Sequence, residues 1–163
     1  MIATRQATAA DAAAIRALTR EAYAKWVAVT GREPLPMRVD YDEAVKSHRF
    51  DLLYDNDTLA ALIETAHEAD HVLIVNVAVA PSHQKRGLGR QLLALAETIA
   101  RDAGLGLAKL YTNGLMAENI ALYRRLGYRI DREEPSGGHV QVHMSKAIGG
   151  RPAHSGLPTS DAP

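Results

Sequence analysis

The sequence predicts a mixed α/β fold, with one central sheet and helices on both of its faces. Three observations lead to this class. Strand-like apolar segments recur along the 163 residues, amphipathic helical segments lie between several of them, and a turn of hairpin type joins two neighbouring strands. A helix between two later strands suits a β-α-β crossover. We therefore expect a mostly antiparallel sheet that also contains a crossover connection.

The N-terminal part of the chain is predicted to form one strand followed by two helices. Residues 2–7 have the composition of a short strand. Thr8 and Asp11 stand three apart, a variant of the capping box, and the apolar residues that follow recur at helical spacing. The glycine and prolines of 30–36 end this helix, and Asp40 can cap a second, shorter one.

The middle of the chain is predicted to contain three consecutive strands. Residues 50–54 are strand-like, and the turn at 55–57 is typical of a hairpin. Residues 58–69 suit strand or helix by propensity, and the preceding turn favours a strand. Residues 71–80 are β-branched and almost continuously apolar until Pro81, which indicates a central strand buried on both faces.

The C-terminal part adds two helices and three strands. We expect a helix over 87–104, a strand over 107–112, and a helix over 116–127 whose apolar residues again follow helical periodicity. A final pair of strands surrounds the turn at 135–138. We expect one domain over residues 1–147.

Composition narrows the classes of function. Residues 148–163 are rich in Gly, Pro and Ser and predict a flexible tail. The chain has no cysteine, which excludes disulfides, thiolate metal sites and a cysteine nucleophile. Its 19 basic and 19 acidic residues cancel, so no overall field attracts nucleic acid or a membrane. Because it shows neither a signal peptide nor a membrane-spanning run, we expect a soluble, cytoplasmic protein.

The stretch "KRGLGR" predicts an anion site at the start of a helix. Backbone N–H groups and the helix dipole favour an anion there, and Gly87 and Gly89 let it approach the backbone. Lys85, Arg86 and Arg90 add positive charge, so a pyrophosphate would fit. The Walker loop G-x-x-x-x-G-K-[ST] is absent, and the dinucleotide fingerprint lacks its third glycine, since Leu92 stands at that position. A basic surface loop before an ordinary helix is the other interpretation of these six residues.

A longer stretch, "VAVAPSHQKRGLGRQLL", resembles motif A of the GNAT superfamily of N-acetyltransferases. Gln84, Gly87 and Gly89 fall on the positions of its Q/R-x-x-G-x-G/A signature. Residues 116–128, "MAENIALYRRLGY", resemble the second motif of the same family. The resemblance covers roughly 50–147, and two motifs in the right order are more specific than either alone.

The resemblance implies that acetyl-coenzyme A is the cosubstrate. It also implies that strands 71–80 and 107–112 splay apart, so that the pantetheine arm enters between them. The pyrophosphate would meet the loop N–H groups, and the arm would contact the strand and the last helix. The cofactor-binding candidates are Val77, Ala78, Val79, Gln84, Lys85, Arg86, Gly87, Leu88, Gly89, Arg90, Asn119 and Tyr123.

Acyl transfer to an amine needs a base, an oxyanion donor and an acid. By the resemblance, the N–H of Val79 is the oxyanion donor and Tyr123 is the acid. Similar proteins often have a carboxylate where this chain has Val75, so Glu64 on the neighbouring strand becomes the candidate base, acting directly or through a water. A surface strand glutamate is the other interpretation of Glu64. Asn76 could only orient a water.

The sequence thus favours an acetyl-CoA-dependent N-acetyltransferase that acts on the primary amine of a small molecule. A longer acyl-CoA donor and a non-catalytic acyl-CoA-binding module are the alternatives. Small acidic excesses in 26–49 and 131–139, where the family resemblance places the acceptor, favour a cationic amine. We expect no metal, since histidines four apart on a strand are roughly 13 Å apart. We expect neither nucleic acid nor membrane as a partner, and a homodimer stays open.

Overall fold

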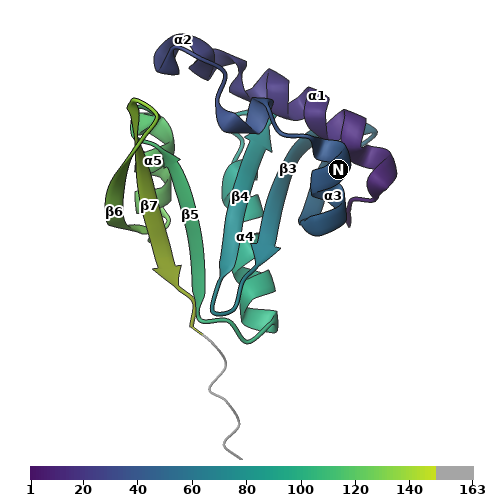
Figure 1. The fold of residues 1–163 in the computed structure, drawn as a ribbon. Helices are drawn as coiled ribbons and strands as arrows, with labels where there is room; N and C mark the ends of the chain where they lie inside the picture. Colours follow the sequence, from purple (N-terminus) through teal and green to yellow (C-terminus); the bar gives the residue numbers. More distant parts are fainter. Residues whose placement is uncertain (150–163) are drawn as a thin grey trace, which may run out of the picture.

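The computed structural model describes residues 1–149, which form a seven-stranded sheet in the order β1-β2-β3-β4-β5-β7-β6 (Figure 1). The strands are β1 (Ile2–Gln6), β2 (Arg49–Asp55), β3 (Thr58–His67), β4 (Val72–Val79), β5 (Leu107–Asn113), β6 (Arg129–Ser136) and β7 (His139–Ala147). The α-helices are α1 (Ala12–Tyr23), α2 (Val27–Thr30), α3 (Tyr41–Ser47), α4 (Leu88–Asp102) and α5 (Ala117–Arg125). β4 and β5 pair in parallel and every other pairing is antiparallel, which confirms the predicted fold class.

Helices cover both faces of the sheet and create two separate cores. On one face, Ile15 of α1 and Tyr41 of α3 pack against Leu62 of β3. On the other face, Leu92 of α4 packs in a second cluster with Met144 of β7. Among residues 1–149, no helix combines the length and the apolarity needed to cross a membrane.

The predicted caps and turns form as the sequence indicates. The Asp11 carboxylate accepts a hydrogen bond from the Thr8 N–H at 2.8 Å, closing the start of the first helix. The Asp40 carboxylate accepts from the N–H of Asp42 at 3.0 Å and caps α3. The hairpin turn between β2 and β3 places Asn56 at φ 52°, a left-handed conformation that asparagine tolerates. The ambiguous segment after that turn is strand β3.

A β-bulge in the β3–β4 pairing lies at the point where β4 stops pairing with β5. Glu64 pairs with Asn76 while Thr65 pairs with Ile74, so Val75 is the extra residue of β4. A bulge bends its strand and increases the local twist. The parallel pairing of β4 with β5 includes Ile74 and goes no further, and Figure 1 shows the two strands diverging beyond it. The expected splay is therefore present.

The core extends one residue past the predicted domain. The side chain of Ile148 is buried with the α4 core, and its N–H bonds to the Gly106 carbonyl at 2.9 Å. The carbonyl of Gly149 accepts from Arg101 Nε at 3.3 Å. The remainder of the predicted tail, 150–163, lies outside the described residues.

Replacing Ile148 with alanine should test how far the folded core extends. Since Ile148 is 5% exposed, the substitution leaves a cavity and should lower the free energy of unfolding by about 2–4 kcal/mol. Ile130→Ala is the matched control, because Ile130 is 38% exposed on β6. Denaturant unfolding of both variants measures the difference. Equal, small changes would place Ile148 outside the core.

Candidate active site

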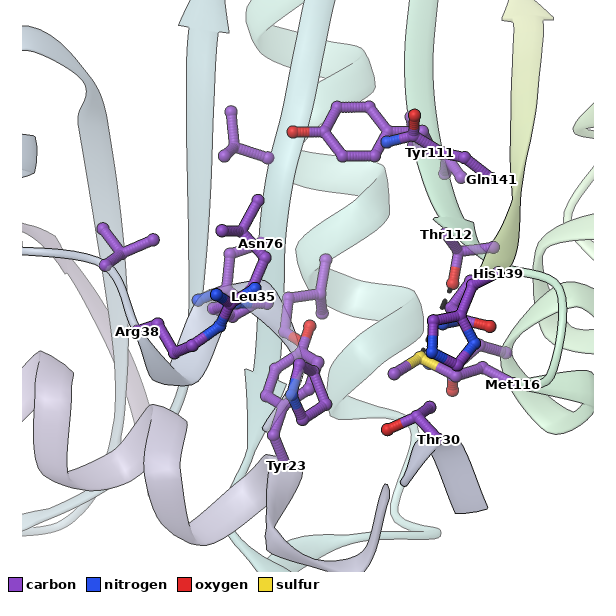
Figure 2. Close-up of a pocket in the computed structure, with 18 of the residues that line it drawn as sticks. Tyr23, Thr30, Leu35, Arg38, Asn76, Tyr111, Thr112, Met116, His139 and Gln141 are labelled. Carbon is purple, nitrogen blue, oxygen red and sulfur yellow. Dashed lines mark hydrogen bonds between the residues drawn. The ribbon is translucent and has the colours of Figure 1, made fainter. Parts of the chain in front are cut away.

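A cleft of about 390 Å³ occupies the gap where β4 leaves β5. In Figure 2, Tyr23 and Asn76 lie on the β4 side and face Thr112 and Met116 on the β5 side. The cleft is also lined by residues from segment 30–39 and from the β6–β7 hairpin. The predicted site residues that line it are Glu64, Val77, Asn119 and Tyr123.

Along the edge of β4 that faces the cleft, only every second residue turns its backbone N–H and carbonyl groups toward the cleft. The Ala80 N–H bonds to the Ala60 carbonyl of β3 at 2.8 Å. Because backbone groups alternate in direction along a strand, Ala78 also turns its N–H and carbonyl toward β3, whereas Val77 and Val79 turn theirs toward the open side. Ala78 therefore has no backbone group to offer in the cleft, contrary to the prediction that it contacts the arm.

Two side chains cap the carbonyls on this edge. The Tyr23 hydroxyl donates to the Val77 carbonyl at 3.2 Å, and Gln84 Nε2 donates to the Val79 carbonyl at 3.2 Å. Within residues 1–149, no hydrogen bond engages the N–H of Val77 or Val79. The open edge therefore offers two N–H donors beside carbonyls that each already accept one hydrogen bond, which suits a ligand that carries carbonyl oxygens.

The glycine-spaced loop leads into α4 with its N–H groups unbonded. Gly87 has φ 80° and precedes the helix, and Gln91 is the first residue whose N–H joins the ladder, bonding to the Gly87 carbonyl at 3.1 Å. The N–H groups of 88–90 come before that ladder and point out of the helix start. The Leu88 side chain is buried in the core, so only its backbone can meet a ligand. The three exposed cations beside these groups are Lys85, Arg86 and Arg90.

Glu64 is a buried carboxylate and not a surface one. It is 2% exposed, lines the cleft, and its Oε1 lies 2.7 Å from Nδ1 of His48. Burial raises the pKa of Glu64, and the hydrogen bond from His48 opposes this effect. The His48 side chain is 35% exposed, so the pair connects the cleft to solvent on the side of α3.

Tyr123 stands in the cleft with its phenol protonated. Burial raises the pKa of Tyr123 to about 12, and its ring packs edge-on against Tyr128 with centroids 6.2 Å apart. Asn119, one turn earlier on α5, places its Nδ2 3.8 Å from the Met116 sulfur. A phenol with this pKa keeps its proton at neutral pH.

Metal coordination has no support among residues 1–149, where no group of three or more His, Asp or Glu could hold an ion. Among the described residues, His139 is the one histidine that lines the cleft, and His48 is hydrogen-bonded to Glu64. The site offers backbone hydrogen-bond donors, the buried carboxylate of Glu64 and several tyrosine hydroxyls.

Comparison with protein families decides the identity of this fold. Residues 13–128 match the model described as the acetyltransferase (GNAT) family. The chain belongs to that family. None of the curated proteins matches this GNAT chain significantly.

Solved structures share the fold at low identity. The PaiA N-acetyltransferase of Thermoplasma acidophilum, in complex with coenzyme A, is 19% identical, with a TM-score of 0.78 over 90% of this chain and 99% of that one. The ribosomal-protein-S18-alanine N-acetyltransferase of Escherichia coli is 21% identical, with a TM-score of 0.76 over 94% and 98%. The putative acetyltransferase yncA of Salmonella typhimurium, with its cofactor acetyl-CoA, is 21% identical, with a TM-score of 0.71 over 96% and 99%.

Glu64→Gln should stabilise the GNAT domain at neutral pH. A raised carboxyl pKa means that the fold prefers the protonated form, so its stabilising effect is full in acid and is lost as pH rises through the raised pKa. Glutamine imitates the protonated carboxyl, so the variant should melt a few degrees above the parent at pH 7 and near the parent at pH 4.

The exposed residue Glu21 supplies the control, since Glu21→Gln should change the melting temperature little at either pH. Calorimetric scans at the two pH values make the comparison. If the Glu64→Gln variant melts well below the parent at pH 7, the conclusion that the ionised Glu64 carboxylate destabilises the fold is wrong.

Proposed function

We propose that this GNAT-family protein transfers an acetyl group from acetyl-CoA to the primary amine of a small molecule. One observation carries the proposal. The unpaired edge of β4, with its free N–H groups at Val77 and Val79, lies directly before the glycine-spaced start of α4. An acyl-CoA has carbonyls along its arm and a pyrophosphate at its end, which are the two chemistries that these elements accept.

The residues present fit coenzyme A. A Cβ built at Gly89 would meet no heavy atom within 4 Å, so nothing in the protein fills the space beside these N–H groups. Lys85, Arg86 and Arg90 supply the charge that a pyrophosphate needs. Gln84 supports the site indirectly, because its amide holds the end of β4. When bound, acetyl-CoA supplies the activated acyl group.

The side chains of the cleft can manage the protons of this reaction. The carbon–nitrogen bond forms as the carbon–sulfur bond breaks, and an entering ammonium loses two protons in all. Glu64 takes the first, directly or through a water, and makes the amine nucleophilic. Tyr123 donates a proton to the departing sulfur and recovers one from the acylated nitrogen. The N–H of Val79 is the candidate donor to the oxyanion.

His48 gives Glu64 a route to release its proton. The carboxylate is buried, and during turnover its cleft side is covered by substrates. Nδ1 of His48 lies 2.7 Å from Glu64 and its ring reaches solvent, so one proton per turnover can leave on the side away from the reaction. This route does not require the cleft to open.

The cover over the cleft favours a small acceptor. Arg32 Nη2 donates to the Gly137 carbonyl at 3.0 Å, which ties segment 30–39 to the β6–β7 turn above the site. A peptide chain would have to pass through this connection. The name of the S18-alanine acetyltransferase of Escherichia coli indicates an alanine of a ribosomal protein as its acceptor, so a protein is the competing class of acceptor here.

Release of free thiol from acetyl-CoA in the presence of an amine panel tests the function. We expect turnover with small primary amines, little with peptide N-termini, and slower turnover with longer acyl donors. A protein that binds acetyl-CoA but releases no thiol with any amine would be the binding module that the sequence also allowed. Faster turnover with a longer acyl-CoA than with acetyl-CoA would show that the preferred donor carries a longer acyl group.

Gly89→Glu should abolish coenzyme A binding without unfolding the protein. The backbone of Gly89 is not left-handed and its Cβ direction is open, so the new side chain fits while its carboxylate repels a pyrophosphate. Calorimetric titration with acetyl-CoA should show at least a tenfold loss of affinity. Gly106→Glu places the same charge beyond the other end of α4, where the Cβ is also free, and should bind normally. Unchanged affinity in the folded Gly89 variant would refute the anion site.

Tyr123→Phe should lower kcat by about 10²–10⁴-fold and leave acetyl-CoA affinity nearly unchanged, since the ring still packs and only the proton donor is lost. Tyr128→Phe is the matched control. The Tyr128 hydroxyl is buried and has no hydrogen-bond partner in the described part of the chain, so its removal should leave activity intact. Steady-state kinetics of both variants decide the point, and a Tyr123 variant within twofold of the parent would remove this residue from the mechanism.

A further inference from the structure

The charged side chains of the cleft are arranged by depth. Glu64 is at the buried floor, whereas Arg38 is exposed and lines the same cleft. Glu33, which also lines it, is paired with Arg20, whose Nη2 donates to its Oε1 at 2.8 Å, and the hydrogen bond from Arg20 lowers the pKa of Glu33 most, with a smaller effect from the charge of Arg38. Within residues 1–149, the Arg38 guanidinium has neither an ion pair nor a hydrogen bond. The cleft is therefore negative at its floor and positive at its mouth.

Apart from Glu33, which is paired with Arg20, the acidic residues that suggested a cationic acceptor are not part of this cleft. Asp42 pairs with Arg16 at 3.0 Å and Glu43 pairs with Lys46 at 3.0 Å, both on the outer surface. The acidic residues of the two segments that do not line the cleft are Asp40, Asp42, Glu43, Asp131, Glu133 and Glu134. The net charge of a sequence segment therefore does not describe the charge that an acceptor meets.

Asn76 leaves a buried acceptor at the floor of the cleft. The Tyr41 hydroxyl donates to the Pro36 carbonyl at 2.6 Å, so it can only accept from Asn76, whose Nδ2 lies 3.4 Å away. Nδ2 also lies 3.4 Å from the Thr19 hydroxyl. These contacts fix the amide orientation, and Oδ1 of Asn76 finds no hydrogen-bond partner among residues 1–149 although Asn76 is 3% exposed.

The unpartnered oxygen of Asn76 and the carboxylate of Glu64 belong to one place. The two residues are direct partners in the β3–β4 register, so their side chains leave the same face of the sheet as neighbours. Both line the cleft, and both accept hydrogen bonds. A primary ammonium carries three N–H donors and would satisfy both acceptors at once.

We propose that the acceptor is a small amino acid, a primary amine that carries a carboxylate. Its amine binds at Asn76 Oδ1 and Glu64, and its carboxylate binds the guanidinium of Arg38, which Figure 2 places on the Asn76 side of the cleft. Leu35, Pro36 and other apolar lining residues favour an apolar side chain. This inference rests on the proposed function and names the substrate class for it.

The test compares three amines that differ only in the carboxylate: phenylalanine, phenylalaninamide and phenethylamine, with leucine, leucinamide and isoamylamine as a second set. Thiol release from acetyl-CoA gives kcat/KM for each. The amino acids should exceed their amides and amines by about 10- to 100-fold, mainly through KM, as expected for a charge-assisted hydrogen bond to arginine. Spermidine, a cationic amine, should be poorer still.

Arg38→Met isolates the proposed contact because it keeps the apolar stem and removes the charge. It should raise the KM for phenylalanine about 10- to 100-fold and leave phenethylamine kinetics and the KM for acetyl-CoA unchanged. Arg16→Met, an exposed arginine outside the cleft, is the control and should keep the parent's preference.

The outcomes separate the two proposals. Amides and amines acetylated as well as the amino acids, or spermidine preferred to them, would overturn the amino-acid acceptor and leave the acetyltransferase standing. A preference for the carboxylate that survives Arg38→Met would also overturn it. Acetyl-CoA binding with no thiol release to any amine would overturn the proposed function, and the acceptor with it.

Discussion

The loss of pairing between β4 and β5 after Ile74 determines the rest of the site. A parallel ladder that continued along both strands would bury the N–H groups of Val77 and Val79 and close the sheet. The bulge at Val75 ends the ladder by bending β4 at that point. β5 instead stays fully paired with β7, so the sheet divides into two parts that share only a short parallel contact.

An open strand edge inside a domain has to be kept from closing or from pairing elsewhere. The Tyr23 hydroxyl and the Gln84 amide do this by occupying its carbonyls, and each comes from a different helix-bearing segment. Burial raises the pKa of Tyr23 well above its usual range, so the hydroxyl remains a donor. Burial of the polar side chains of Glu64 and Asn76 also lowers the free energy of unfolding. Stability is therefore lower than it could be at the same positions where the chemistry is proposed.

Much of the fold could be predicted because local patterns and tertiary packing agree. The cap residues Thr8 and Asp40 and the left-handed Asn56 specify boundaries by short-range hydrogen bonds and backbone sterics, which a single sequence displays. The left-handed Gly87 before α4 follows from the same local backbone sterics, which the glycine-spaced loop displays in the sequence. Ile148 stands at the boundary between the last strand and the Gly-rich tail, where composition alone does not show that its side chain is buried.

The acceptor side of the cleft could not be predicted, because its contacts join residues far apart in the chain. His48, just before β2, is hydrogen-bonded to Glu64 on β3, and nothing in the sequence near His48 indicates this contact. The contact of Tyr23 with β4 could not be predicted either, since a tyrosine on an amphipathic helix usually packs in the core. The role given to Ala78 required knowing which neighbour each backbone group faces, and the register alone supplies that.

Amide chemical shifts of β4 during a titration with coenzyme A test the central claim most directly. If the open edge receives the ligand, the amides of Val77 and Val79 should shift strongly and exchange more slowly with solvent, together with those of 85–90. The amide of Ala78, which faces β3, should change little, and so should those of β1. Saturable binding that leaves Val77 and Val79 unaffected would contradict the account.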